Sequence, residues 1–122
     1  MLKVKNTPNG SPSKDYVFTS DPSGELIFKG NFEDYYKNED DPWDQSAQGE
    51  SAKYYQLSRN RIATLLQQQS ATNVLEIGCG LGYACQHFNS QHQANYTGWD
   101  ISNEAITKAQ HKFPAFGFAV FD

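Results

Sequence analysis

Three glycines at alternate positions, Gly78, Gly80 and Gly82, constrain the fold of this chain more than any other feature. They follow the mostly apolar run 73–77 and precede a segment with helix-type spacing from 83 to 90. An apolar run bounded by polar residues and glycine is typical of a strand buried on both faces. Glycine permits positive φ angles and close approach of the backbone to a ligand, and the free N–H groups of the next helix face the same space. The segment therefore predicts a strand, a ligand-binding turn and a helix, whereas an ordinary tight turn would need only one or two glycines.

The residues that follow repeat this alternation of strand and helix. Runs at 96–99 and 116–121 predict two further strands, and between them Ser102 is the expected N-cap of a helix that Pro114 interrupts. From residue 73 onward the order is strand, helix, strand, helix, strand, which predicts a parallel sheet with right-handed crossovers. We therefore expect an α/β fold with flanking helices.

The residues before this unit predict a hairpin and a helical cap. Residues 1–15 are rich in Asn, Pro, Ser and Lys, which predicts a flexible tail. Two β-prone runs, 16–19 and 25–28, flank turn residues and predict a hairpin outside the main sheet. A short helix at 32–36 then leads into a loop that carries aromatic residues. We expect three parts: the tail (1–15), the hairpin and cap segment (16–50), and a partial cofactor-binding domain (51–122).

The strongest helix signal lies at 51–69, with Ser51 as the expected N-cap. Its apolar periodicity predicts one buried side, which also carries an arginine. The residues expected on that side are Tyr54, Leu57, Arg61, Ile62, Leu65 and Leu66.

Composition narrows the class of partner and the cellular location. The 122 residues carry a formal net charge of −4, so there is no basic surface for a phosphate backbone, and a small-molecule partner is favoured over nucleic acid. The two cysteines and the scattered histidines do not have metal-ligand spacing, so we expect reduced thiols and no metal site. Neither a signal peptide nor a membrane-spanning run is found, which favours the cytoplasm and excludes a membrane partner.

An acidic residue, Asp100, closes the second predicted strand about twenty residues after the glycine loop. In a βαβ unit the ends of adjacent strands lie side by side, so an acid at this place accepts hydrogen bonds from the ribose hydroxyls of a nucleoside on the loop. The alternative is that Asp100 only precedes the Ser102 cap.

These residues resemble a known family. The stretch Glu76-Ile77-Gly78-Cys79-Gly80-Leu81-Gly82 is similar to motif I of class I S-adenosylmethionine-dependent methyltransferases, and Gly98-Trp99-Asp100-Ile101-Ser102 is similar to their next motif. The resemblance implies the first three strands of a Rossmann-like sheet and S-adenosylmethionine as cofactor. It places the methionine part of the cofactor at the loop, the ribose on Asp100, the adenine on Ile101 and the adenine amino group at Asp122. The loop residues that it implies as contacts are Glu76, Gly78, Cys79, Gly80 and Gly82.

A second resemblance concerns the segment before the long helix. Asp41-Pro42-Trp43, followed by Ser51-Ala52-Lys53-Tyr54-Tyr55, is similar to the cap region of methyltransferases related to the nodulation N-methyltransferase. In that group an aromatic residue from this segment covers the cofactor, and Trp43 is the matching position. The alternative is that Trp43 packs on the edge of the core.

The resemblance predicts methyl transfer from S-adenosylmethionine to a small-molecule acceptor. In the class I fold the acceptor-side residues come from the fourth strand and later loops, so no catalytic residue is assigned within the 122 residues. We expect the chain to be the cofactor-binding half, inactive alone: a shortened form, an interrupted gene product or a half completed by another chain. The first strand would then be an open sheet edge, which predicts self-association.

Two other readings remain open from the residues alone. A nicotinamide- or flavin-binding unit needs G-x-G-x-x-G, but the sixth position is Tyr83 when counted from Gly78 and Cys85 when counted from Gly80. The second reading is a non-catalytic nucleoside-binding or protein-interaction module. Cofactor binding without turnover would distinguish this module from an enzyme.

Overall fold

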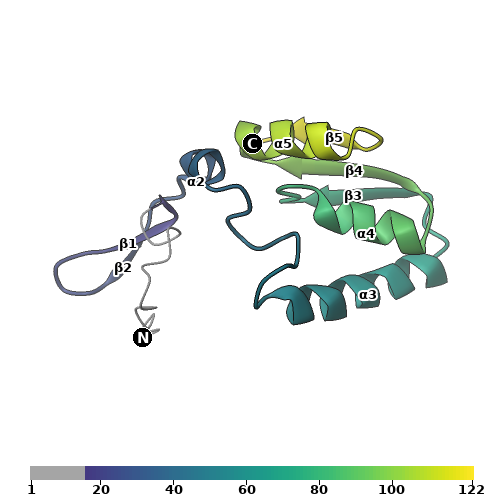
Figure 1. Cartoon of the computed structure of the whole chain (residues 1–122), viewed down its shortest axis with the longest axis horizontal. Coiled ribbons are helices and arrows are strands. Elements are labelled where there is room, and N and C mark those ends of the chain that lie inside the picture. The colour runs from purple at the N-terminus through teal and green to yellow at the C-terminus, as the bar shows by residue number, and fades with distance from the viewer. Residues whose placement is uncertain (1–15) are drawn as a thin grey trace.

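A computed structural model describes residues 16–122, and the expected tail at 1–15 lies outside the described residues. The main sheet consists of β3 (Asn73–Ile77), β4 (Asn95–Asp100) and β5 (Gly117–Val120), paired in parallel in the order β3-β4-β5. The crossovers are α4 (Tyr83–Gln91) and α5 (Asn103–Lys112), which lie on the same face of the sheet (Figure 1). The α/β fold with three parallel strands that the sequence predicts is confirmed.

The N-terminal hairpin is also confirmed. Its strands, β1 (Phe18–Ser20) and β2 (Leu26–Phe28), pair antiparallel and form a sheet of their own. The turn is fixed by Asp21, whose Oδ1 accepts hydrogen bonds from the Ser23 hydroxyl at 2.6 Å and the Glu25 N–H at 2.9 Å. Short side-chain bonds of this kind favour the turn over extended backbone. The helix after the hairpin, α2 (Phe32–Asn38), begins at the N-cap Asn31.

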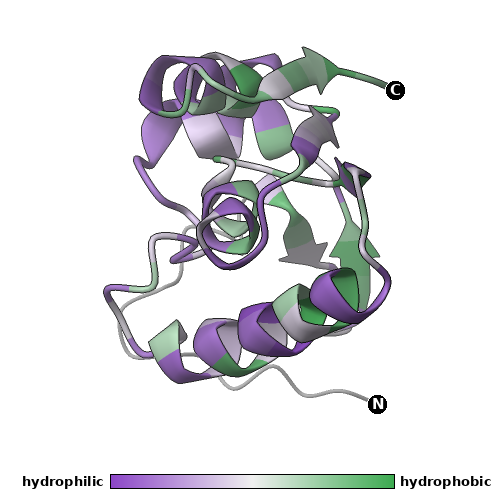
Figure 2. Cartoon of the chain, turned by 90° about the vertical axis from the view of Figure 1, so that its right-hand side faces the viewer, coloured by the Kyte–Doolittle hydropathy of each residue, from purple (hydrophilic) through white to green (hydrophobic). Residues whose placement is uncertain are grey.

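The buried side of α3 (Ala52–Gln68) differs from the predicted one. Arg59 and Ala63 are its buried residues, whereas Tyr54 and Leu57 are 77% and 66% exposed. Of the predicted residues, Leu66 is partly buried and packs against the core as expected. The small Ala63 side chain faces the core beside α4, and close approach of two helices is easiest at a small residue. Figure 2 shows apolar and polar residues alternating along α3, so its periodicity allows more than one buried face.

The N-terminal end of α3 also differs from the prediction. Ser51 occupies the N-cap position but makes no side-chain capping hydrogen bond. Its φ and ψ angles of −77° and −10° are helical, whereas a capping side chain normally belongs to an extended residue. By contrast Ser102 has the extended conformation and accepts from the Ala105 N–H, so the predicted cap of α5 is confirmed.

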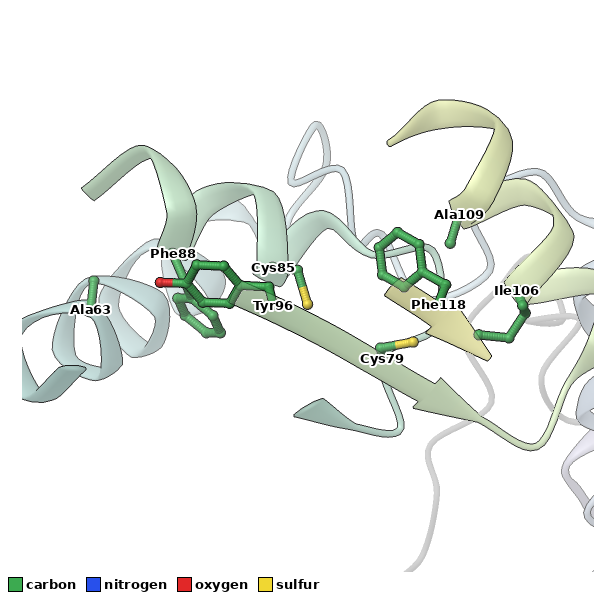
Figure 3. Close-up of a cluster of buried hydrophobic side chains, with 8 residues drawn as sticks. All are labelled: Ala63, Cys79, Cys85, Phe88, Tyr96, Ile106, Ala109 and Phe118. Carbon is green, nitrogen blue, oxygen red and sulfur yellow. The ribbon is translucent and has the colours of Figure 1, made fainter. Parts of the chain in front are cut away.

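The core lies between the sheet and the helices on its covered face. It is built from small and aromatic side chains that interdigitate (Figure 3). Its buried members are Ala63, Cys79, Cys85, Phe88, Tyr96, Ile106, Ala109 and Phe118. The two thiols are free and buried here, and they pack as small apolar groups.

The other face of the sheet is open among residues 16–122. Leu75 and Ile77 on β3 are 45% and 80% exposed, so the prediction of a strand buried on both faces is wrong for this part of the chain. The physical reason is that both crossover helices cover the same face, and β3 is an edge strand as expected. Within the same residues no helix is long and apolar enough to cross a bilayer.

Candidate functional site

The turn between β3 and α4 has the backbone that the glycines predict. The φ angles of Gly78, Gly80 and Gly82 are +74°, +53° and +82°. Side chains on L-residues disfavour this left-handed region, so each position favours glycine. Two hydrogen bonds attach the turn to β4, because the Gly78 and Cys79 N–H groups donate to the Trp99 carbonyl at 2.7 and 3.0 Å.

The three glycines face different surroundings. A Cβ built on Gly78 would meet no atom within 4 Å. On Gly82 it would meet the Phe118 ring at 2.5 Å, and on Gly80 the Gln45 amide at 2.3 Å. Packing within the protein therefore explains the absence of a side chain at Gly80 and Gly82. Of the three glycines, only Gly78 leaves open space in front of the turn.

Asp100 at the end of β4 joins the second strand to the glycine loop. Its Oδ2 accepts from the Gly80 N–H at 2.8 Å, and its Oδ1 accepts from the Ser102 N–H at 2.9 Å. The carboxylate is 9% exposed. The predicted meeting of the two strand ends is confirmed, and Asp100 also supports the turn before α5. Each oxygen keeps a second lone pair for an incoming donor.

A pocket of about 470 Å³ opens between the carboxyl ends of β3 and β4 and the cap segment. Its volume lies in the usual range of small-molecule sites. Aromatic side chains dominate the lining, with a few polar groups among them. The lining residues are Phe32, Tyr36, Trp43, Gln45, Tyr55, Ile77, Gly78, Trp99, Asp100, Ile101 and Phe121.

The structure brings together four of the residues that the sequence singled out: Trp43, Gly78, Asp100 and Ile101 all line this pocket. The other five lie around it. Gly80 and Gly82 are buried in the turn, and Cys79 points into the core beside Phe118 and Ile106 (Figure 3). Asp122 is exposed at the last position, where its neighbour Phe121 forms the pocket wall instead.

Glu76 lies behind the turn, on the helix-covered side. Its Oε2 accepts a hydrogen bond from the Cys85 thiol at 3.1 Å. Burial raises the pKa of the Glu76 carboxyl, and burial next to Glu76 raises the pKa of the Cys85 thiol. The Cys79 thiol is also held protonated, since burial raises its pKa to about 12. Neither cysteine has the electropositive surroundings of a nucleophilic thiolate.

The cap loop after α2 is fixed by side chains that hold its backbone carbonyls. The Tyr35 hydroxyl donates to the Pro42 carbonyl at 2.8 Å, and the Tyr55 hydroxyl donates to the Trp43 carbonyl at 2.7 Å. Burial raises the pKa of Tyr55, so this hydroxyl stays protonated and remains a donor. The Trp43 indole is thereby held at the pocket, edge-on to Tyr35 with ring centroids 5.1 Å apart.

Helix α2 brings Phe32 and Tyr36 to the pocket and docks on α5 at both of its ends. At its start, the Glu33 carboxylate accepts from the Ser102 hydroxyl and from the Glu104 N–H, both at 2.9 Å. At its end, the Lys108 ammonium donates to the Tyr36 and Glu39 carbonyls. A seven-residue helix is not stable alone, so these contacts hold the aromatic wall in place.

Several lining residues were missed by the sequence reasoning. Tyr36, Gln45 and Tyr55 reach the pocket from the cap and the start of α3. The helical spacing of Phe32 and Tyr36 was a signal that these rings share a side. Nothing in the local pattern indicated Gln45. Among residues 16–122 no cluster of potential metal ligands occurs, which agrees with the residue types at the pocket.

Comparison with known proteins finds one family model and several solved structures that are similar to this chain. Residues 75–122 match a family model described as a methyltransferase domain. The structure resembles DesVI of Streptomyces venezuelae with 22% sequence identity and a TM-score of 0.52, over 73% of this chain and 35% of that one. It also resembles the plantazolicin methyltransferase BpumL, solved with a monoazolic desmethylPZN analog and SAH, with 23% identity and a TM-score of 0.48, over 77% of this chain and 34% of that one. No curated protein sequence matches.

The likeness to DesVI shows a shared fold. The chain spans about a third of the length of these two solved proteins, as their coverages of 35% and 34% give. The region that matches the family model contains the glycine loop from Gly78 onward, Asp100 and Ile101. Trp43 and the rest of the cap lie outside it.

Proposed function

We propose that this chain is the S-adenosylmethionine-binding part of a methyltransferase. The observation that carries the proposal is the open space at Gly78, which faces a pocket bordered by Asp100 at the ends of two parallel strands. Such strand ends are where nucleotide-type ligands bind in open α/β sheets. The match of residues 75–122 to a methyltransferase-domain model supports the same conclusion.

The residues present fit the cofactor part by part. The free lone pairs of Asp100 suit the two ribose hydroxyls, and Ile101 with the neighbouring ring of Phe121 gives an apolar surface for adenine. Gly78 admits the chain that leads to the sulfur atom, and Trp43 covers the pocket from the cap. S-adenosylmethionine supplies a methyl group that is already activated by its sulfonium sulfur. The protein therefore has to position donor and acceptor and exclude water.

The loop residues outside the pocket lining act on its shape in this proposal. Gly80 and Gly82 allow the turn to pack against Gln45 and Phe118. Cys79 anchors the turn in the core, and Glu76 supports it from the covered side. Asp122 adds an acid at the adenine edge of the pocket. The cofactor contacts predicted at Glu76, Cys79, Gly80, Gly82 and Asp122 stay predictions beside these supporting roles.

Further proposals concern the division of the chain, the acceptor and the cellular setting. Segment 16–50 serves as a cap over a cofactor-binding part at 51–122, as in the nodulation N-methyltransferase group. The net charge of −4 and the aromatic pocket favour a small-molecule acceptor. Two free buried thiols suit the cytoplasm. The exposed β3 edge favours self-association.

Calorimetric titration with S-adenosylhomocysteine tests the proposal, with NADH as the control ligand. We expect the chain to bind the first and not the second, and Asp100→Ala to abolish binding. Glu50→Ala, which removes an exposed acid outside the pocket, is the matched variant and should bind like the unmodified chain. Thermal melting of each variant checks folding. A folded chain that binds NADH, or neither ligand, would overturn the proposal.

A further inference from the structure

Gln45 in the cap loop places a side-chain amide directly over the glycine loop. Its Oε1 accepts from the Leu81 N–H at 3.0 Å and from the Tyr36 hydroxyl at 3.4 Å. Its Nε2 donates to the Cys79 carbonyl at 3.5 Å. The residue lines the pocket, although it is 36 positions away from Leu81 in the sequence.

The backbone of Gln45 is held firmly from two sides. Its N–H donates to Asp41 Oδ1 at 2.7 Å, and its carbonyl accepts from Arg59 Nη2 at 2.8 Å. Arg59 is only 8% exposed and lies over the Tyr55 ring at 4.5 Å from its centroid. Hydrogen bonds with a charged partner are the stronger ones, so the main chain at Gln45 is fixed relative to α3.

The side chain of Gln45 is held much less firmly than its backbone. Two of its three hydrogen bonds, at 3.4 and 3.5 Å, are at the long limit for such bonds, and only the one from Leu81 has ordinary length. Turning the amide therefore costs about one hydrogen bond. The Leu81 N–H would then be a free donor at the start of α4, whose N-cap Gly82 has no side chain to occupy it.

We propose that Gln45 binds the carboxylate at the amino-acid end of the cofactor, an inference that rests on the proposed function. With the amide turned, the Leu81 N–H beneath it and the Nε2 group of Gln45, which lines the pocket, would form a pair of donors. Such a pair is the complement of a carboxylate. The carboxylate takes the place of Oε1 on the Leu81 N–H, and the turned amide donates its own N–H to the other oxygen. The helix N-terminus and the nearby Arg59 cation favour the negative charge.

A pair of ligands separates this role from a structural one. S-adenosylhomocysteine carries the amino-acid end, whereas 5′-methylthioadenosine has the same nucleoside and sulfur without it. We expect Gln45→Ala to lower the affinity for S-adenosylhomocysteine about 10-fold, the usual effect of losing a hydrogen bond to a charged group. The affinity for methylthioadenosine should change by about twofold at most. Gln48→Ala, which removes an exposed amide from the same loop, should leave both affinities unchanged.

Gln45→Glu is the sharper variant, because it keeps an acceptor for the Leu81 N–H and replaces the donor by a carboxylate oxygen. We expect it to lose S-adenosylhomocysteine at least as strongly as Gln45→Ala does, through repulsion of like charges. If Gln45→Glu binds S-adenosylhomocysteine like the unmodified chain, the proposal is overturned. It is also overturned if Gln45→Ala loses affinity for both ligands equally, because a residue that only shapes the pocket gives that result. If the unmodified chain binds neither ligand, the proposed function itself fails and this inference falls with it.

Discussion

Alanine substitutions at Gly78 and Gly82 distinguish a glycine that faces the pocket from a glycine that is packed against other side chains. Gly78 and Gly82 share a positive φ, at +74° and +82°, so alanine costs about 1 kcal/mol of backbone strain at either position. A Cβ at Gly78 meets nothing within 4 Å. A Cβ at Gly82 meets Phe118 Cζ at 2.5 Å and Phe113 Cδ2 at 3.3 Å, and overpacking of this kind adds about 1–3 kcal/mol.

The expected free energies of unfolding follow from these terms. Gly78→Ala should lower the free energy of unfolding by about 1 kcal/mol, and Gly82→Ala by about 2–4 kcal/mol. Urea denaturation followed by circular dichroism measures both values, with the slope of the transition as a check that each variant unfolds in the same manner. In thermal melts the second variant should unfold about 4–12 °C below the first.

Ligand binding should rank the same variants in the opposite order. The methyl group of Gly78→Ala projects into the pocket, so we expect the affinity for S-adenosylhomocysteine to fall about 10-fold or more despite the small loss of stability. Gly82→Ala, where folded, should keep a larger share of its binding. Unchanged affinity in Gly78→Ala would refute the argument that the ligand approaches the backbone at this glycine. Equal stabilities of the two variants would refute the packing argument.

Three further predictions test the surroundings of the site. Asp100→Asn should lower the free energy of unfolding by about 1–3 kcal/mol in urea denaturation, because an amide NH₂ would face one of the two backbone N–H groups that the carboxylate accepts from. Burial raises the pKa of Cys79 to about 12 and that of Cys85 above its usual range, so the native thiols should resist a thiol reagent at pH 8 and react on unfolding. Because the unfolded thiols ionise at lower pH, the free energy of unfolding should fall as the pH rises above about 9. A free energy of unfolding that does not change there would contradict the raised pKa values. Leu75→Lys on the open face should change stability by about 1 kcal/mol at most and reduce self-association in sedimentation, whereas an unchanged association state would exclude this face as the contact.

The sequence predicts most of the main sheet because its signals are local. The glycine loop, the Ser102 cap and the change of apolar period each depend on neighbours within a few residues. The strands at 73–77 and 95–100 and the helices α4 and α5 therefore lie where the pattern places them. The closeness of Asp100 to Gly80 could also be predicted, since adjacent parallel strands end at the same edge.

The burial of α3 and of the open sheet face could not be predicted in the same way. A helix with several apolar rows of side chains buries the row that contacts a neighbouring element. The neighbour of α3 is α4, and the sequence of α3 alone does not show where α4 lies. Likewise, an apolar strand sequence shows that Leu75 and Ile77 suit burial, but the elements that cover them are not set by the strand itself. Both residues are exposed among the described ones.

The pocket is formed by two parts of the molecule whose positions are determined by different kinds of interaction. Its floor, from Gly78 to Asp100, is set by local turn geometry and strand pairing. Its wall and cover come from α2 and the cap loop, which are positioned by long-range hydrogen bonds such as that between Glu33 and Ser102. Because Ser102 also donates to Asp100, the cap and the floor share one hydrogen-bond network. A substitution in the cap is therefore expected to affect the orientation of the carboxylate at the floor, and binding measurements on cap variants have to be read beside their stabilities.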